Sequence, residues 1–181
     1  AIRKTAACLR DEELTVRMAA TISLARIAEK GSRVAVEEVA ACVEHPSADV
    51  REAALISLRQ LVDRGDPTAA SKLAAIGRTS PSPEARKAAI MAMQSLAMSG
   101  SAEAEATLLL GAHDASPSVR AAAVAALGDA AARSSKAVHA ALSMALNDRE
   151  SAVRRAAVAA LGSLARGDDE ADALTANDEA M

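Results

Sequence analysis

The segment Val119-Arg120-Ala121-Ala122-Ala123-Val124-Ala125-Ala126-Leu127 occurs five times along the chain with substitutions. The other copies begin at Val16, Val50, Ala85 and Val153. Their second residue is always Arg, at positions 17, 51, 86, 120 and 154, so the copies are 34, 35, 34 and 34 residues apart. A period this regular predicts a repeat protein, in which each repeat is one structural unit stacked on its neighbours.

Each copy has the pattern of an amphipathic helix. When its first residue is position 0, positions 0, 3, 4, 7, 8 and 11 are apolar or small, with Ser23 and Ser57 the most polar. This spacing places one apolar stripe along a helix. Ser82-Pro83, Ser116-Pro117 and Pro46-Ser47 precede three of the copies and favour helix starts, because Ser caps the first turn and Pro fits the first helical position.

A second apolar stretch lies upstream of each copy, as in Val34–Val43, Ala69–Ile76 and Val138–Leu146. The sequence therefore predicts two antiparallel helices in each repeat, over residues 1–31, 32–65, 66–99, 100–134 and 135–167. Residues favouring a break recur at the ends of these repeats, namely Gly31, Gly65, Gly100, Ser134 and Gly167. Residues 168–181 form an acidic tail, or a truncated sixth repeat that caps the repeat domain at 1–167.

The core Val-Arg-x-Ala-Ala-x-x-Ala/Ser-Leu, with an Asp five residues before the Val in three copies, resembles the HEAT repeat in the short form of phycobilin lyase-type proteins. The resemblance implies an all-α, right-handed α-solenoid of five HEAT-like helix pairs. It also implies a polar ladder between repeats, formed by Asp11, Arg17, Arg51, Arg86, Asp114, Arg120, Asp148 and Arg154. His45 and Ser80 replace Asp in two copies, so we expect the ladder to be incomplete around repeats 2 and 3.

The composition agrees with close helix packing. Ala accounts for 49 of the 181 residues, and Phe, Tyr and Trp are absent. Ala is the best helix former. The tetratricopeptide repeat, which has a similar period, is excluded because its pattern requires aromatic residues. The missing rings also exclude base stacking and aromatic cages for ammonium groups.

The charge is nearly balanced, with a net value of −3. Residues 167–181 carry six acids and no base, so residues 1–166 sum to +3. A chain this close to neutral is not expected to bind nucleic acid by charge. The sequence shows no signal peptide and no apolar run near 18 residues, so we expect a cytoplasmic protein without a membrane partner.

Cys8 and Cys42 occupy the repeat position that is Gly77, Gly111 or Ala145 elsewhere. We expect this position to be a point of close helix approach, with a disulfide or a metal pair as the less favoured alternatives. The histidines His45, His113 and His139 occupy non-equivalent positions of the repeat. No two of them have the spacing that places two metal ligands on one helix face. No phosphate-binding or nucleophile motif is present, so we expect no enzyme activity, cofactor or metal.

The second helix of each repeat has residues that point away from its apolar stripe, and the resemblance implies that they line the concave side. Several of them are apolar with charged neighbours, which is typical of an interaction surface. The predicted partner-binding residues are Met18, Ile22, Glu52, Ile56, Arg59, Lys87, Met91, Gln94 and Met98. The alternative is that some are buried between neighbouring repeats.

The sequence thus predicts a non-catalytic scaffold that binds a protein, as a peptide, a helix or a partner subunit. Two alternatives stay open: a HEAT-like lyase or accessory subunit of an enzyme complex, and a structural spacer without a specific ligand.

Overall fold

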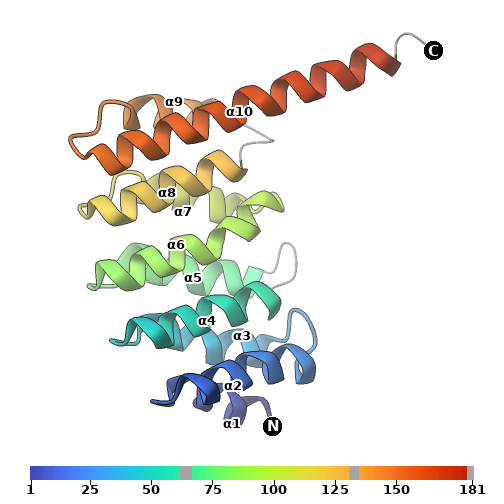
Figure 1. Ribbon diagram of the computed structural model, residues 1–181, viewed down its shortest axis with the longest axis vertical. Helices are drawn as coiled ribbons and strands as arrows, with labels where there is room; N and C mark the ends of the chain where they lie inside the picture. Colours follow the sequence, from blue (N-terminus) through green and yellow to red (C-terminus); the bar gives the residue numbers. More distant parts are fainter. Residues whose placement is uncertain (62–66, 131–134, 179–181) are drawn as a thin grey trace.

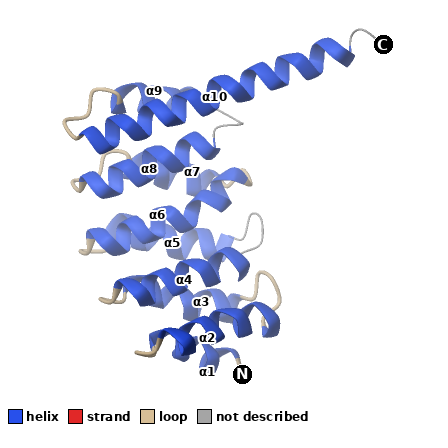
Figure 2. Cartoon of the chain, in the orientation of Figure 1, coloured by secondary structure: helices blue, strands red, loops and turns tan. Residues whose placement is uncertain are grey.

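A computed structural model describes residues 1–61, 67–130 and 135–178, with side chains described as far as residue 165. All regular structure in these ranges is helical (Figure 2). The helices are α1 (Ile2–Ala7), α2 (Leu14–Ile27), α3 (Arg33–Ala40), α4 (Ala48–Leu61), α5 (Pro67–Thr79), α6 (Pro83–Met98), α7 (Ala102–Gly111), α8 (Pro117–Ala130), α9 (Lys136–Ala145) and α10 (Ser151–Asp178). Short 3-10 turns, Cys8–Arg10 and Ala41–Glu44, extend α1 and α3.

The helices form two layers stacked along one axis, with α1 and α10 at opposite ends of the stack (Figure 1). In one layer α2, α4, α6, α8 and α10 pack in chain order, and in the other α1, α3, α5, α7 and α9 do the same. Each helix of one layer also packs on its sequence neighbour in the other. The predicted helix pairs are therefore confirmed, and they build an all-α solenoid. We call the layer of even-numbered helices the second-helix layer.

Local signals in the sequence explain several helix boundaries. Ser82 caps α6 by accepting a hydrogen bond from the Ala85 amide at 3.2 Å, and Pro83 is the first residue of that helix. Gly31 and Gly100 adopt φ angles of 74° and 86°, which a residue with a side chain rarely adopts. The predicted breaks at Gly65 and Ser134 lie outside the described residues.

The predicted break at Gly167 is wrong, because α10 continues without interruption to Asp178. Glycine permits a positive φ but does not require one, and helix-forming residues such as Ala165 and Glu170 flank it. Residues 168–178 therefore extend the second helix of the fifth pair rather than starting a sixth.

The apolar stripe is buried as predicted in α4 and α6 but shifts at the first pair. In α2 the side chains of Arg17 and Thr21 are buried while Ala19 is exposed. Position 3 of each second helix faces the preceding pair, and no described pair precedes α1 and α2. At the other end of the stack, Val158 occupies the position of buried Val124 and is 62% exposed.

Close helix approach occurs at Gly111, as its repeat position predicts, and at Gly128, which was not predicted, whereas an added Cβ at Gly77 would meet its nearest neighbour at 3.4 Å. A Cβ on Gly111 would lie 2.8 Å from Cδ1 of Ile90, and one on Gly128 would lie 2.6 Å from Cα of Ala160. Cys42 is buried at the position equivalent to Gly111. The packing prediction is wrong for Cys8, which is exposed. Gly111, at the equivalent position, is covered by Ile90 of the preceding pair, and no described pair precedes α1 and α2. Both cysteines are free thiols.

Candidate protein interface

The repeated arginines bind the loops that join the two helices of each pair. In every copy Nη1 donates to the carbonyl oxygens five and six residues earlier in the chain, at 2.7 to 3.3 Å. For Arg120 these are the carbonyls of Ala115 and Asp114. Each arginine therefore satisfies main-chain acceptors that the turn leaves without a partner.

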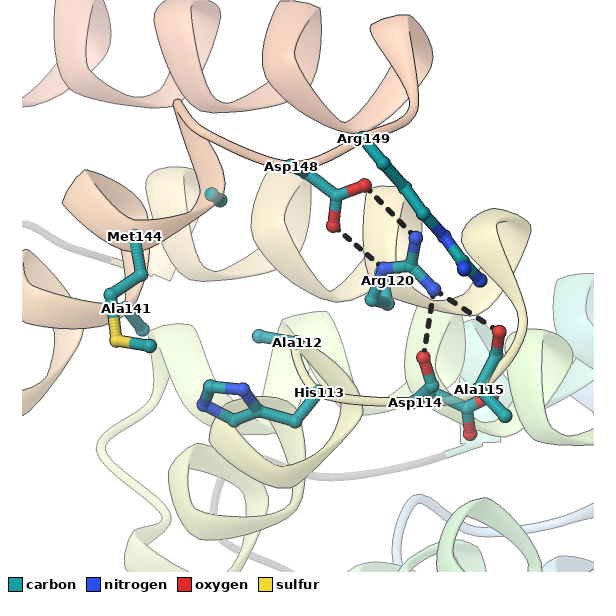
Figure 3. Close-up of a pocket in the computed structure, with 10 residues that line it drawn as sticks. Ala112, His113, Asp114, Ala115, Arg120, Ala141, Met144, Asp148 and Arg149 are labelled. Atoms are coloured by element: carbon teal, nitrogen blue, oxygen red, sulfur yellow. Dashed lines mark hydrogen bonds and ion pairs between the residues drawn. The ribbon is translucent and has the colours of Figure 1, made fainter.

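Two arginines also bridge to the next repeat through paired hydrogen bonds. Arg86 donates from Nε and Nη2 to Asp114, both at 2.8 Å. Arg120 does the same with Asp148 at 2.8 and 2.9 Å (Figure 3). These bonds hold the pKa of Asp114 below its usual range and lower the pKa of Asp148 to about 2. Paired bonds of this kind are among the strongest polar contacts in proteins.

The ladder changes in the N-terminal half, where His45 and Ser80 replace Asp. Arg17 is buried and reaches Asp49 on α4 through one contact of 3.1 Å, and its Nε has no hydrogen-bond partner among the described residues. Arg51 has carbonyl contacts but no ion pair to a described residue. His45 keeps one role of the missing carboxylate, because its Nδ1 accepts the amide of Ser47 as Asp114 accepts that of Ser116.

The two remaining ladder residues lie at opposite ends of the stack. Asp11 accepts the amide of Glu13 at 2.9 Å and forms no ion pair with a described residue. Arg154 contacts only the loop carbonyls of Asp148 and Arg149 among the described groups. Their equivalents in the middle of the solenoid bridge to a neighbouring pair, and no described pair lies beyond these ends.

An open groove lies between α2 and α4, with a volume of about 770 Å³. We call it the α2/α4 groove. Its exposed apolar residues are Leu14, Met18, Ile22 and Ile56, with exposed fractions of 59%, 55%, 56% and 45%. The other lining residues are Glu12, Arg17, Thr21, Asp49, Glu52, Ala53 and Gln60.

A second groove, of about 460 Å³, lies between α6 and α8 at equivalent repeat positions. We call it the α6/α8 groove. Met91 is its one large apolar residue, Lys87 lies on its rim, and Gln94 donates a hydrogen bond to Asp129. The remaining lining residues are small: Ser118, Ala121, Ala122, Ala125, Ala126 and Ala152.

The predicted partner-binding residues therefore fall into three groups. Met18, Ile22, Glu52 and Ile56 line the α2/α4 groove, and Lys87, Met91 and Gln94 line the α6/α8 groove. Arg59 and Met98 are exposed but line neither groove. Leu14, Asp49 and Gln60 also line the α2/α4 groove but were not predicted, because Leu14 and Asp49 precede the repeat core and Gln60 lies beside the predicted outward position of Arg59.

A third hollow contains the Arg120–Asp148 pair, together with His113, Met144 and Arg149 (Figure 3). Arg120 and Asp148 already bond to one another and to loop main-chain groups. The described residues include no group of three His, Cys, Asp or Glu side chains that could hold a metal ion. Burial raises the pKa of the Cys42 thiol. No described helix is both long and apolar enough to cross a bilayer.

The stacked helix pairs and their arginine bridges define a helical repeat protein. The chain belongs to the HEAT repeat family, whose model matches residues 2–94 and 95–179. A search of curated proteins gives no match.

Among solved structures the chain is similar to the complex of CpcE and CpcF of phycocyanin lyase from Nostoc sp. PCC7120. The identity is 24% and the TM-score 0.70, over 89% of this chain and 98% of that chain. It is also similar to a designed armadillo repeat protein in complex with the peptide (KR)4. That match has 20% identity and a TM-score of 0.53, over 91% of this chain and 82% of the other.

Proposed function

We propose that this protein is a non-catalytic interaction scaffold that binds a partner protein on its second-helix layer. The observation that carries the proposal is the exposed apolar cluster of Leu14, Met18, Ile22 and Ile56 in the α2/α4 groove. Large apolar side chains that gather in an open groove and are rimmed by charge are typical of binding sites.

The surface is also suited to binding by shape. The layer is held by helix packing and by arginine bridges, so its side chains are presented on rigid helices. Binding to such an ordered surface costs less conformational entropy than binding that must first order a loop of the scaffold. The grooves differ in size and charge, which allows the face to select among partners.

The similar structures support this use of the fold. One is a complex of two proteins, and another is a repeat protein with a bound peptide. We therefore propose a peptide, a helix or a partner subunit as the ligand of this chain.

The test is partner capture from the native cells by cross-linking, with Ile56→Asp and Met91→Asp. Both side chains are exposed on the second-helix layer, so we expect melting temperature to be nearly unchanged and capture to be lost. Leu110→Asp is the matched control, because Leu110 is 57% exposed on α7 in the other layer. Capture that survives both variants, or that is lost equally in the control, would contradict the proposal.

A second candidate function is that of a lyase or of an accessory subunit of an enzyme complex. It is favoured by the similarity to the complex of phycocyanin lyase subunits. The test is incubation of the purified chain with a bilin, alone and with a candidate acceptor protein. A covalent bilin adduct that forms only when this chain is present would support the second candidate over the scaffold.

A further inference from the structure

The α2/α4 groove has an apolar floor with a regular spacing. Leu14, Met18 and Ile22 follow one another at intervals of four residues on α2, and Ile56 is the large apolar residue on α4. Residues at this spacing lie on one helix face, about 6 Å apart along the axis. The apolar side chains of a bound helix recur at the same interval, so a helix lying along the groove could pack its apolar face against both walls.

The charge of the groove is concentrated at one end. Glu12, Asp49 and Glu52 come from the starts of α2 and α4, whereas Gln60, at the other end of α4, is neutral. Arg17 is the single basic residue in the lining, and it is already bonded to Asp49 and to two loop carbonyls. Neither Glu12 nor Glu52 forms an ion pair with a described residue, so two carboxylates face this end without a cation.

The α6/α8 groove, at equivalent positions, lacks both features. Its floor is mainly alanine, and its charges, Lys87 and Asp129, balance. The hollow beside Arg120 has one large exposed apolar residue, Met144, but no unpaired acid, since Asp114 and Asp148 are bonded to arginines. The combination of large exposed apolar residues and unpaired acids is therefore specific to the α2/α4 groove among these three.

We propose that the α2/α4 groove binds an amphipathic helix of a partner protein whose apolar face is followed by Lys or Arg at the end that meets Glu12 and Glu52. This inference rests on the proposed scaffold function and adds the site and the chemistry of the ligand. The apolar contacts supply most of the affinity, and the carboxylates set the direction of the bound helix and the rate of association.

Three fluorescein-labelled probes test the inference by fluorescence anisotropy. The first is an amphipathic helical peptide built from Leu, Ala and Lys. The second has Glu in place of each Lys, and the third alternates Lys and Arg without apolar residues. We expect the first probe, the Leu-Lys peptide, to bind at least about tenfold more tightly than either of the others. Only this peptide has both apolar residues for the floor of the groove and positive charges for its carboxylates.

Matched variants locate the site. Ile22→Gln removes an apolar contact from the α2/α4 groove, and Glu52→Gln removes a charge from it. Leu110→Gln is the control, because Leu110 is exposed on α7 in the other layer. We expect Ile22→Gln to weaken the Leu-Lys peptide about tenfold. Glu52→Gln should weaken it severalfold and reduce its salt dependence, and Leu110→Gln should leave it unchanged. Circular dichroism confirms that each variant is folded.

The outcomes separate the inference from the proposed function. If the Glu-containing peptide binds as well, or if Ile22→Gln and Glu52→Gln leave binding of the Leu-Lys peptide unchanged, the inference is wrong while a binding scaffold remains supported. If none of the probes binds and cross-linking still captures a partner through Ile56, the groove takes a different chemistry and the inference is wrong. If cross-linking also shows no partner that depends on Ile56, the proposed function fails as well.

Discussion

The two ends of this solenoid use the same repeat positions in different ways. At the α8/α10 junction, Arg120 binds Asp148 through two bonds and Gly128 lies against Ala160. At the α2/α4 junction, Arg17 holds Asp49 by one contact, and large apolar side chains line an open groove. Where the repeat pattern is followed most closely, the helices pack tightly and leave small residues at the surface. The groove opens where the sequence departs from that pattern.

The polar contacts between neighbouring second helices are also weaker at the α2/α4 junction than at the α8/α10 junction. The α2/α4 junction contains a buried hydroxyl pair, Thr21 and Ser57, with their oxygens 3.3 Å apart. The corresponding residues at the α8/α10 junction are Val124 and Ala160, both buried. The C-terminal junctions therefore combine apolar contact with strong ion pairs, whereas the first junction has weaker polar bonds and an unsatisfied Arg17 Nε.

The largest effect is expected when the C-terminal ladder is broken. Arg120→Met removes both bonds to the half-buried Asp148 and both loop carbonyl bonds, and should lower the free energy of unfolding by about 3 kcal/mol. Arg51→Met is the matched variant, since among the described residues it removes carbonyl bonds alone, and should cost about 1 kcal/mol. Urea denaturation followed by circular dichroism measures both. Equal losses of unfolding free energy in the two variants would show that the bonds to the Asp148 carboxylate do not contribute to stability.

A somewhat smaller loss is expected from Gly128→Ala. The added methyl would meet the backbone of Ala160, so α8 and α10 must separate, at a cost of about 2 kcal/mol. Gly162→Ala is the control, because no described atom outside its own stretch of helix lies within 4 Å of its added Cβ. Alanine favours the helix over glycine, so Gly162→Ala should raise stability by about 0.5 to 1 kcal/mol. A thermal melt that ranks the two variants the other way would contradict the close contact.

Acid should weaken the C-terminal junctions more than the first one. Arg120 lowers the pKa of Asp148 to about 2 in the folded protein, below a value of about 4 in the unfolded chain. A lowered pKa means that the ion pair stabilises the fold fully above about pH 4 and that this contribution is lost as the pH falls toward 2. Denaturation midpoints measured across this range should fall for the natural chain and change less for Asp148→Asn. Parallel curves for both proteins would contradict this assignment.

Much of this architecture was predictable because its determinants are local. The period, the apolar stripe and the Ser and Pro at helix starts identify the helix pairs from residues that are close in sequence. The exposure of Met18, Ile22 and Ile56 follows from the same periodicity. His45 and Ser80 led us to expect an incomplete ladder around repeats 2 and 3, where Arg51 has no ion pair to a described residue but Arg86 is paired with Asp114.

The remaining features depend on the backbone or on neighbouring repeats. The loop carbonyls that every repeated arginine binds are present at all residues, so the residue pattern does not reveal them. The contact of Arg17 with Asp49 depends on how far α2 and α4 are offset. Cys8 is exposed because of its place at the end of the stack, which a repeat alignment treats as equivalent to the middle.

The smallest effect is expected when an Asp-Arg pair like those of the C-terminal half is introduced into the N-terminal half. Ser80 lies six residues before Arg86, as Asp114 lies six before Arg120, and Arg51 of the preceding pair has no ion pair to a described residue. Ser80→Asp should therefore supply Arg51 with an acceptor. It should raise the free energy of unfolding by about 1 kcal/mol, since the gain of a paired contact is partly offset by burial of a charge.

Thr79→Asp is the control for Ser80→Asp, because it adds the same charge at the adjacent exposed residue. Urea denaturation should show no gain for it. The gain of Ser80→Asp should also disappear in the background of Arg51→Met, which isolates the pairwise energy. If Ser80→Asp stabilises the chain equally in both backgrounds, the carboxylate acts on its own turn, as Asp114 does through the amide of Ser116, and the ladder does not explain the difference between the two halves.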